Sequence, residues 1–140
     1  VGELSGSLLI SKVLNNNNPL KIAIFTSIST SLFVFAITYF TRIIPIGIII
    51  LTIGILQGFY YPSQHTWIAK VSTNQTRGKL FGVVFFTEGS AATIAPFVYG
   101  WLADVFGLIT AYRLASIPIF ISFLLYIVVY LIVEKNKSLK

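Results

Sequence analysis

Four long apolar runs, separated by short polar or charged segments, dominate the pattern of hydrophobic and polar positions along the chain. They cover residues 20–40, 43–69, 78–106 and 111–133 approximately. A helix needs about 20 predominantly apolar residues to span a bilayer, and each run meets that length. The pattern predicts an all-α fold, a polytopic transmembrane helix bundle with four full transmembrane helices.

The segments outside these runs are short. Residues 1–14 cannot span a bilayer, and we expect this N-terminal stub to be the end of a helix whose beginning is missing. The pair Asn18-Pro19 breaks any preceding helix. Residues 134–140 form a polar tail. The whole chain is therefore expected to be one partial transmembrane domain.

Composition supports the membrane assignment. Hydrophobic residues make up 56% of the chain and charged residues only 10%, whereas soluble domains carry roughly 25% charged residues. The basic residues are scattered between apolar runs, which argues against a nucleic-acid partner. No cysteine is present, and a single histidine without spaced ligands predicts no metal site and no cofactor. No pattern of nucleophile and base is visible, so we expect no enzyme.

The distribution of Lys and Arg predicts the topology, because these residues resist translocation across the membrane. Only Arg42 and Arg113 fall on one side. The other side receives eight basic residues: Lys12, Lys21, Lys70, Arg77, Lys79, Lys135, Lys137 and Lys140. We therefore expect a multi-pass protein of the cell membrane with its C-terminus in the cytoplasm.

Small residues follow one stripe of the third run and predict a face for close helix packing and gating motions. The stripe contains Gly82, Gly89, Thr93, Pro96 and Gly100, and Gly78 precedes Gly82 at the four-residue spacing that also favours close packing. Pro96 removes a backbone donor and is expected to kink the helix.

Glu88 is the one acid of the stretch FFTEGSAATIAPFVYG, residues 85–100 of the third run, and is expected near the middle of the bilayer. A charge at that depth costs about 2.5 to 3.5 kcal/mol, so its side chain should face the protein interior or a water-filled cavity. One interpretation makes Glu88 a proton-coupling or substrate-contacting acid. The other makes it a structural acid that bonds a neighbouring helix through Tyr60, Tyr61, Gln64 or His65.

A polar cluster in the second run supplies further candidates. Gln57, Tyr61, Gln64 and His65 are separated by three, four and seven residues, so they share one helix face. They are the candidate substrate or coupling residues together with Glu88. For His65 a simpler interpretation is contact with interfacial water, because Lys70 follows five residues later.

The segment QTRGKLFGVVF, residues 75–85, places Arg77, Gly78 and Gly82 in a loop before a helix. It continues into EGSAATIAPFVYGWLADVFG, residues 88–107, and a predicted outer turn with Tyr112-Arg113. This arrangement resembles the C-terminal half of a major facilitator superfamily transporter, with the four runs as helices nine to twelve of twelve. The resemblance implies that Arg77 and Gly78 belong to a cytoplasmic loop motif and that the second run lines a central cavity.

Two departures from the family pattern are visible. The inner-loop motif of the family carries an acid, whereas the stub offers only Gly6, Ser11 and Lys12. Residues 100–107 fit the beginning of that motif but lack its basic residues, and using them would invert the topology. We therefore expect Asp104 to lie at an outer helix end and to pair with Arg113.

The resemblance implies the C-terminal fragment of a secondary active transporter that moves a small solute by alternating access, with proton coupling as one option. The lipid bilayer and the missing N-terminal helices of the same transporter are then its partners. The start at Val1 and the lack of methionine agree with a fragment. Two alternatives stay open: a dimerising four-helix carrier and a non-transporting membrane subunit.

Overall fold

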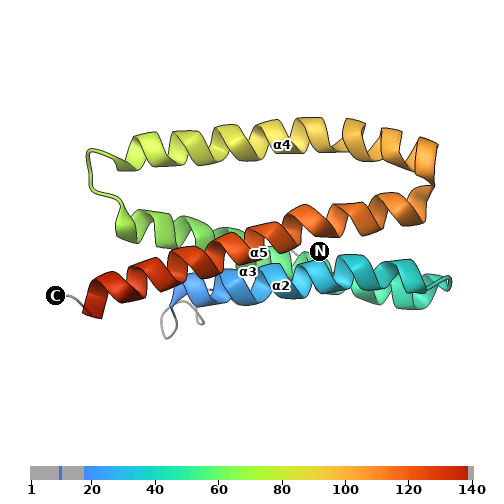
Figure 1. Cartoon of the computed structure of the whole chain (residues 1–140), viewed down its shortest axis with the longest axis horizontal. Helices are drawn as coiled ribbons and strands as arrows, with labels where there is room; N and C mark the ends of the chain where they lie inside the picture. The colour runs from blue at the N-terminus through green and yellow to red at the C-terminus, as the bar shows by residue number, and fades with distance from the viewer. Residues whose placement is uncertain (1–9, 11–17, 139–140) are drawn as a thin grey trace.

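Four long helices, arranged antiparallel, make up nearly all of the described chain in the computed structural model (Figure 1), which describes residue 10 and residues 18–138. They are α2 (Pro19–Ala36, continued by the short 3-10 helix η1, Ile37–Tyr39), α3 (Ile43–Val71), α4 (Arg77–Phe106) and α5 (Leu108–Ser138). All four are long and apolar enough to cross a membrane. The predicted all-α transmembrane bundle is confirmed. Most of the predicted stub lies outside the described residues, as do Lys12 and Lys140.

Local chemistry explains where the helices begin and turn. Asn18 caps α2, because its side-chain oxygen accepts a hydrogen bond from the Leu20 backbone N–H at 3.0 Å, and Pro19 follows in the first turn. Between α4 and α5 the chain reverses at Gly107 alone, whose φ is +85°. Residues other than glycine rarely adopt this backbone conformation. Tyr112 and Arg113 therefore lie inside α5 and not in the outer turn, where we expected them.

Helix α2 is the centre of the packed layer and contacts both α3 and α5. Its buried face consists mainly of small and hydroxyl-bearing residues, among them Ala23, Ser27 and Thr30. Small side chains let helix backbones approach closely, which is the main source of packing in lipid. The hydroxyl of Ser31 also donates a hydrogen bond to the Ser116 carbonyl of α5 at 3.1 Å.

Helix α4 stands apart from this layer (Figure 1) and has no buried residue. A Cβ atom built at Gly78, Gly82, Gly89 or Gly100 meets no other atom within 4 Å. The predicted small-residue stripe thus has no helix against it within the described chain, and its packing role stays a prediction. The helix continues through Pro96 to Phe106.

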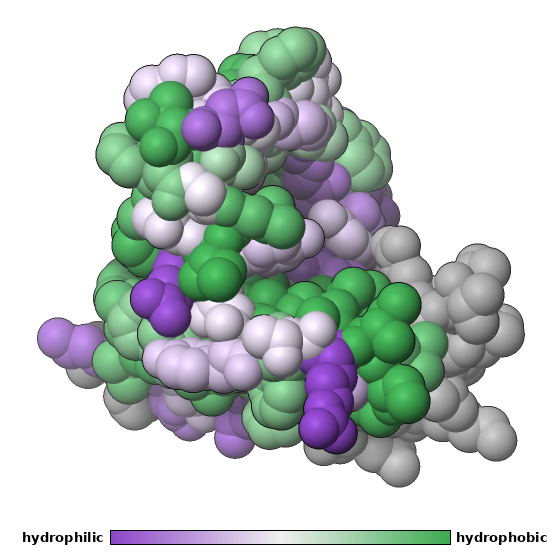
Figure 2. All heavy atoms as spheres, turned by 90° about the vertical axis from the view of Figure 1, so that its right-hand side faces the viewer, coloured by the Kyte–Doolittle hydropathy of each residue, from purple (hydrophilic) through white to green (hydrophobic). Residues whose placement is uncertain are grey.

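The two ends of the bundle differ in charge. The beginning of α2, the α3–α4 loop and the end of α5 lie at one end (Figure 1) and carry Lys21, Lys70, Arg77, Lys79 and Lys135. Arg42 and Arg113 lie at the opposite end, which faces the viewer in Figure 2. The expected pair between Asp104 and Arg113 does not form in the described chain. Instead Arg113 lies 5.6 Å from the centre of the Tyr39 ring and donates a 3.4 Å hydrogen bond to Thr38.

Candidate functional site

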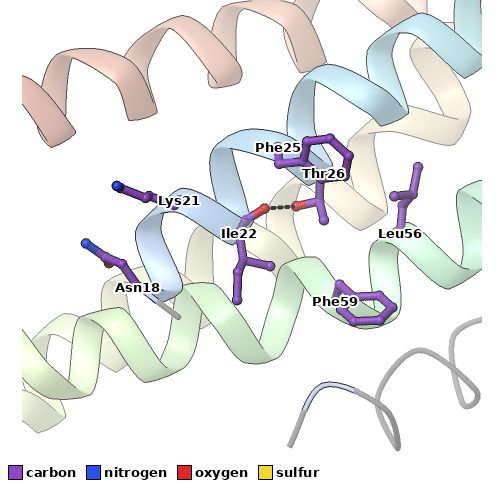
Figure 3. A pocket seen from close by; sticks show the side chains of 7 residues that line it. All are labelled: Asn18, Lys21, Ile22, Phe25, Thr26, Leu56 and Phe59. Atoms are coloured by element: carbon purple, nitrogen blue, oxygen red, sulfur yellow. Dashed lines mark hydrogen bonds between the residues drawn. The ribbon is translucent and has the colours of Figure 1, made fainter. Parts of the chain in front are cut away.

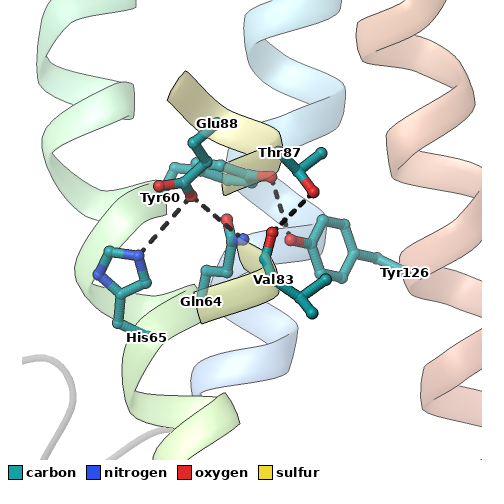
Figure 4. A network of polar contacts seen from close by, with 7 residues as sticks. All are labelled: Tyr60, Gln64, His65, Val83, Thr87, Glu88 and Tyr126. Carbon is teal, nitrogen blue, oxygen red and sulfur yellow. Dashed lines mark hydrogen bonds and ion pairs between the residues drawn. The ribbon is translucent and has the colours of Figure 1, made fainter. Parts of the chain in front are cut away.

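The carboxylate of Glu88 is the meeting point of α3 and α4 (Figure 4). Its Oε1 accepts a hydrogen bond from Nε2 of Gln64 at 3.4 Å and lies 3.7 Å from Nε2 of His65. Gln64 and His65 are adjacent on α3, and one carboxylate oxygen reaches both. Three of the residues predicted as site candidates are therefore brought together by the fold.

Two phenyl rings of α4 hold His65 in place. Phe81 and Phe85 are one turn apart, and their ring centres lie 5.7 Å and 5.4 Å from that of His65 with edge-to-face geometry. Glu88 follows Phe85 by three residues, so the same face of α4 presents two rings and a carboxylate to α3. The side chains of His65 and Glu88 are 31% and 30% exposed, so each keeps part of its surface open.

Two atoms of this cluster are buried and have no hydrogen-bond partner among the described residues: Oε1 of Gln64 and Nε2 of His65. A buried polar atom without a partner costs about 1–3 kcal/mol. The cluster therefore has unused capacity for one hydrogen-bond donor at Gln64. At His65 the ring nitrogen lies slightly too far from Glu88 for a good hydrogen bond.

A tyrosine pair joins α3 to α5 beside this cluster. The hydroxyl groups of Tyr60 and Tyr126 are 3.0 Å apart, and their ring centres are 6.0 Å apart in edge-to-face geometry (Figure 4). Tyr126 is not among the residues predicted from the sequence, because helix periodicity does not show which helices meet. The available signal was its position, a single tyrosine inside the apolar segment 123–129 of the last span.

A cavity of about 760 Å³ opens between α3, α4 and α5 next to Glu88. Figure 2 shows hydrophilic residues within the recess beneath α4. Its polar lining comes from Tyr60, Tyr61, Gln64, Thr87, Glu88 and Ser122, and its apolar lining from Val83, Val84, Ala91, Ala92, Ala95 and Pro118. Gln57 lines a second cavity of about 270 Å³, which it shares with Tyr60 and Tyr61. Of the candidate residues of α3, Gln57 lines the smaller cavity, Gln64 lines the larger one and Tyr61 lines both, whereas His65 lines neither.

The lining of the larger cavity combines one charged group with neutral polar groups. Among its described residues, Glu88 is the one with a full charge, and amide and hydroxyl groups surround it. Such a lining can bind a solute through hydrogen bonds and can exchange a proton at the carboxylate. Within the described residues no group of three His, Asp or Glu side chains could hold a metal ion.

Arg77 stabilises the loop that joins α3 to α4. Its guanidinium donates hydrogen bonds to the Ala69 carbonyl and the Ser72 hydroxyl, both at 3.3 Å. Ala69 lies in the last turn of α3, where carbonyl groups lack helical partners and attract positive charge. The hydroxyls of Thr73 and Thr76 also bond each other at 2.9 Å. The predicted motif residue Arg77 thus ties the beginning of α4 to the end of α3, about 16 Å along α4 from Glu88.

The fold and its cavity define a polytopic α-helical membrane protein with a polar pocket inside the bundle. A family model described as Major Facilitator Superfamily matches residues 1–140. The chain therefore belongs to the major facilitator superfamily, whose members are transporters. No curated protein and no solved structure matches the chain significantly.

Proposed function

We propose that the chain forms helices nine to twelve of a secondary active transporter that moves a small solute by alternating access. The observation that carries this proposal is the contact of Glu88 with Gln64 and His65 at the edge of a cavity of about 760 Å³. A mid-membrane site between helices is where transporters of this type bind their solutes. The eight missing helices of such a transporter are the partners this proposal requires.

We further propose that transport is coupled to protons at Glu88. The carboxylate is the single acid in the cavity lining, and the only ion-pair partner found for it in the described chain is a histidine. A proton bound at this pair neutralises the charge in the cavity. Protonation and solute binding can therefore favour different conformations of the transporter. Gln57, Tyr61, Gln64 and His65 are proposed to contact the solute or to position the carboxylate.

The orientation is proposed from charge. The end with Lys21, Lys70, Arg77, Lys79 and Lys135 is assigned to the cytoplasm, in accordance with the positive-inside rule. The C-terminus then lies in the cytoplasm and the protein in the cell membrane.

The test is the variant Glu88→Gln in the complete transporter, which keeps the size and hydrogen-bonding ability of the side chain but removes its charge. Proteoliposomes with an imposed pH gradient are incubated with an external radiolabelled solute, selected in a first screen of sugars, amino acids and organic ions. We expect at least a 100-fold loss of gradient-driven accumulation, with the amount of folded protein unchanged on size-exclusion chromatography.

Asp104→Asn is the matched control, because it makes the same chemical change at an exposed residue near the end of α4. We expect it to accumulate solute like the wild type. Unchanged accumulation by Glu88→Gln would remove Glu88 from the coupling mechanism.

A non-transporting membrane subunit is the second candidate, and the exposed stripe on α4 is the observation that favours it. In that case Glu88→Gln or a change at Gln57 alters assembly and not solute flux. Blue-native gels beside the flux assay separate the two functions. The dimerising four-helix carrier has less support, because the charge bias between the two ends is strong.

A further inference from the structure

A groove of about 350 Å³ lies between α2 and α3 at the basic end of the bundle, away from the Glu88 cavity (Figure 3). Its lining is Asn18, Lys21, Ile22, Phe25, Thr26, Leu56 and Phe59. Phe25 is 65% exposed although it is one of the largest side chains of α2. The groove thus presents an apolar surface that the described helices leave uncovered.

The polar and apolar residues of the groove are segregated along its length. Asn18 and Lys21 lie at the end where α2 begins, and the apolar residues follow toward the middle of the bundle (Figure 3). Thr26 adds no free polar group, because its hydroxyl donates to the carbonyl groups of Ile22 and Ala23 at 2.9 Å and 3.1 Å. A ligand of this groove therefore has one polar end and an apolar remainder.

The charge at the polar end is positive and held in position. The ammonium group of Lys21 lies 5.6 Å from the centre of the Tyr130 ring of α5, a distance at which the ring attracts a cation. Among the described residues that line the groove, none is acidic. The polar end is thus complementary to a single negative charge such as a phosphate diester.

The length of the groove matches one leaflet of a bilayer. From Asn18 to Thr26 the helix rises about 12 Å, and half of the hydrocarbon core of a bilayer is about 15 Å thick. If the phosphate of a lipid lies at Lys21, one of its acyl chains can run past Ile22 and Phe25 toward the middle of the bilayer.

We propose that this groove binds one anionic phospholipid, with the phosphate at Lys21 and one acyl chain in the apolar part of the groove. Basic pockets between transmembrane helices suit anionic headgroups, and the cytoplasmic leaflet supplies such lipids. The site is separate from the Glu88 cavity and does not depend on solute transport.

The test places a photo-crosslinking benzoylphenylalanine at position 25, an aromatic replacement of Phe25. The whole protein is reconstituted in vesicles of equal parts phosphatidylglycerol and phosphatidylcholine and irradiated, and the adducts are identified by mass spectrometry. We expect phosphatidylglycerol adducts to exceed phosphatidylcholine adducts about fivefold, which corresponds to about 1 kcal/mol for one basic residue near the surface.

Three variants make the result specific. With Lys21→Gln the ratio should fall to about one, whereas Arg42→Gln at the opposite end should leave it unchanged. The same crosslinker at Phe86, which is 76% exposed on α4, should label both lipids equally.

Equal labelling of the two lipids at position 25 would overturn the proposal, and so would adducts with protein alone, which would mean that another helix fills the groove. Loss of the lipid adduct on addition of millimolar glycerol phosphate would assign the site to a soluble phosphate and would equally overturn it.

Discussion

Glu88 illustrates at the scale of one residue how a carboxylate is retained inside a membrane span. Insertion of the charge costs about 2.5 to 3.5 kcal/mol, and a hydrogen bond to a charged group contributes about 1.5 to 3 kcal/mol. The bond from Gln64 at 3.4 Å is long, so it offsets only part of the cost. The nearby ring of His65 and the open cavity must supply the remainder, which is consistent with a residue that functions in more than helix packing.

Tyr126 offers the sharpest prediction at this scale, because its hydroxyl bonds that of Tyr60 on another helix. Tyr60→Phe, Tyr126→Phe and the double variant form a double-mutant cycle. We expect a coupling free energy of about 0.6 kcal/mol, the typical value for hydrogen bonds between membrane helices. Unfolding of the protein in mixed detergent micelles measures it.

Tyr99→Phe serves as the control of this cycle, because it removes a tyrosine hydroxyl from α4, where the structure gives it no bond to Tyr60 or Tyr126. Additive effects of Tyr60→Phe and Tyr126→Phe would contradict the hydrogen bond.

At the scale of elements, α2 and α4 use small residues in opposite ways. The small residues of α2 are buried against α3 and α5, and the hydroxyl of Ser27, 3% exposed, is satisfied by its own helix at 2.6 Å. The glycines of α4 have open space around them. A stripe of small residues in the sequence thus indicates a helix that can pack closely. Only the structure shows whether another helix packs against that stripe.

Leucine substitutions test this difference in packing between α2 and α4. Ser31→Leu inserts a large side chain where α2 packs against α5 and removes the hydrogen bond to Ser116. Overpacking of this kind costs typically 1–3 kcal/mol of unfolding free energy. Gly89→Leu meets no neighbour, and it should be neutral or stabilising by up to about 1 kcal/mol, because leucine favours helix more than glycine does. Thermal unfolding of the 140-residue chain in detergent gives both values.

Ser29→Leu, at a partly exposed position of the same helix α2, controls for the change in polarity. Destabilisation by Gly89→Leu comparable to that of Ser31→Leu would mean that another surface packs against α4.

At the scale of the whole molecule, much of the fold could be predicted from the sequence. The membrane spans can be recognised because the bilayer requires long apolar runs. Asn18-Pro19 marks the beginning of the first span, and Thr41-Arg42 separates the first span from the second. The separation of α4 could not be predicted, because it depends on which helix faces meet. The outer turn expected at Tyr112-Arg113 lies earlier, at Gly107, because the positive φ of one glycine is enough to reverse the chain.

The candidate site could be predicted in part for a similar reason. Gln64 and His65 share a helix face with Tyr61, and Glu88 stood out as an acid in an apolar run, so a contact between them was among the expected alternatives. Tyr126 comes from a third helix about 40 residues later, and helix periodicity carries no information about contacts between helices.

The topology gives a prediction for the entire chain. The sequence contains no cysteine, so single cysteines can be introduced directly. We expect Asn74→Cys, in the α3–α4 loop, to react with a membrane-impermeant maleimide only when the reagent has access to the cytoplasmic side. Thr41→Cys, between α2 and α3, should react only from outside. The reverse pattern would invert the proposed orientation.

The position of Glu88 along α4 has an electrical consequence. From Lys79 at the basic end the helix rises about 13 Å to Glu88, and from there about 20 Å to Trp101. A proton that reaches Glu88 from the far side therefore crosses about three fifths of the membrane voltage. At 100 mV the work done on that proton is about 1.4 kcal/mol, which is a factor of about ten in an equilibrium constant. The occupancy of the carboxylate, and with it the rate of any coupled transport, should respond to voltage as well as to pH.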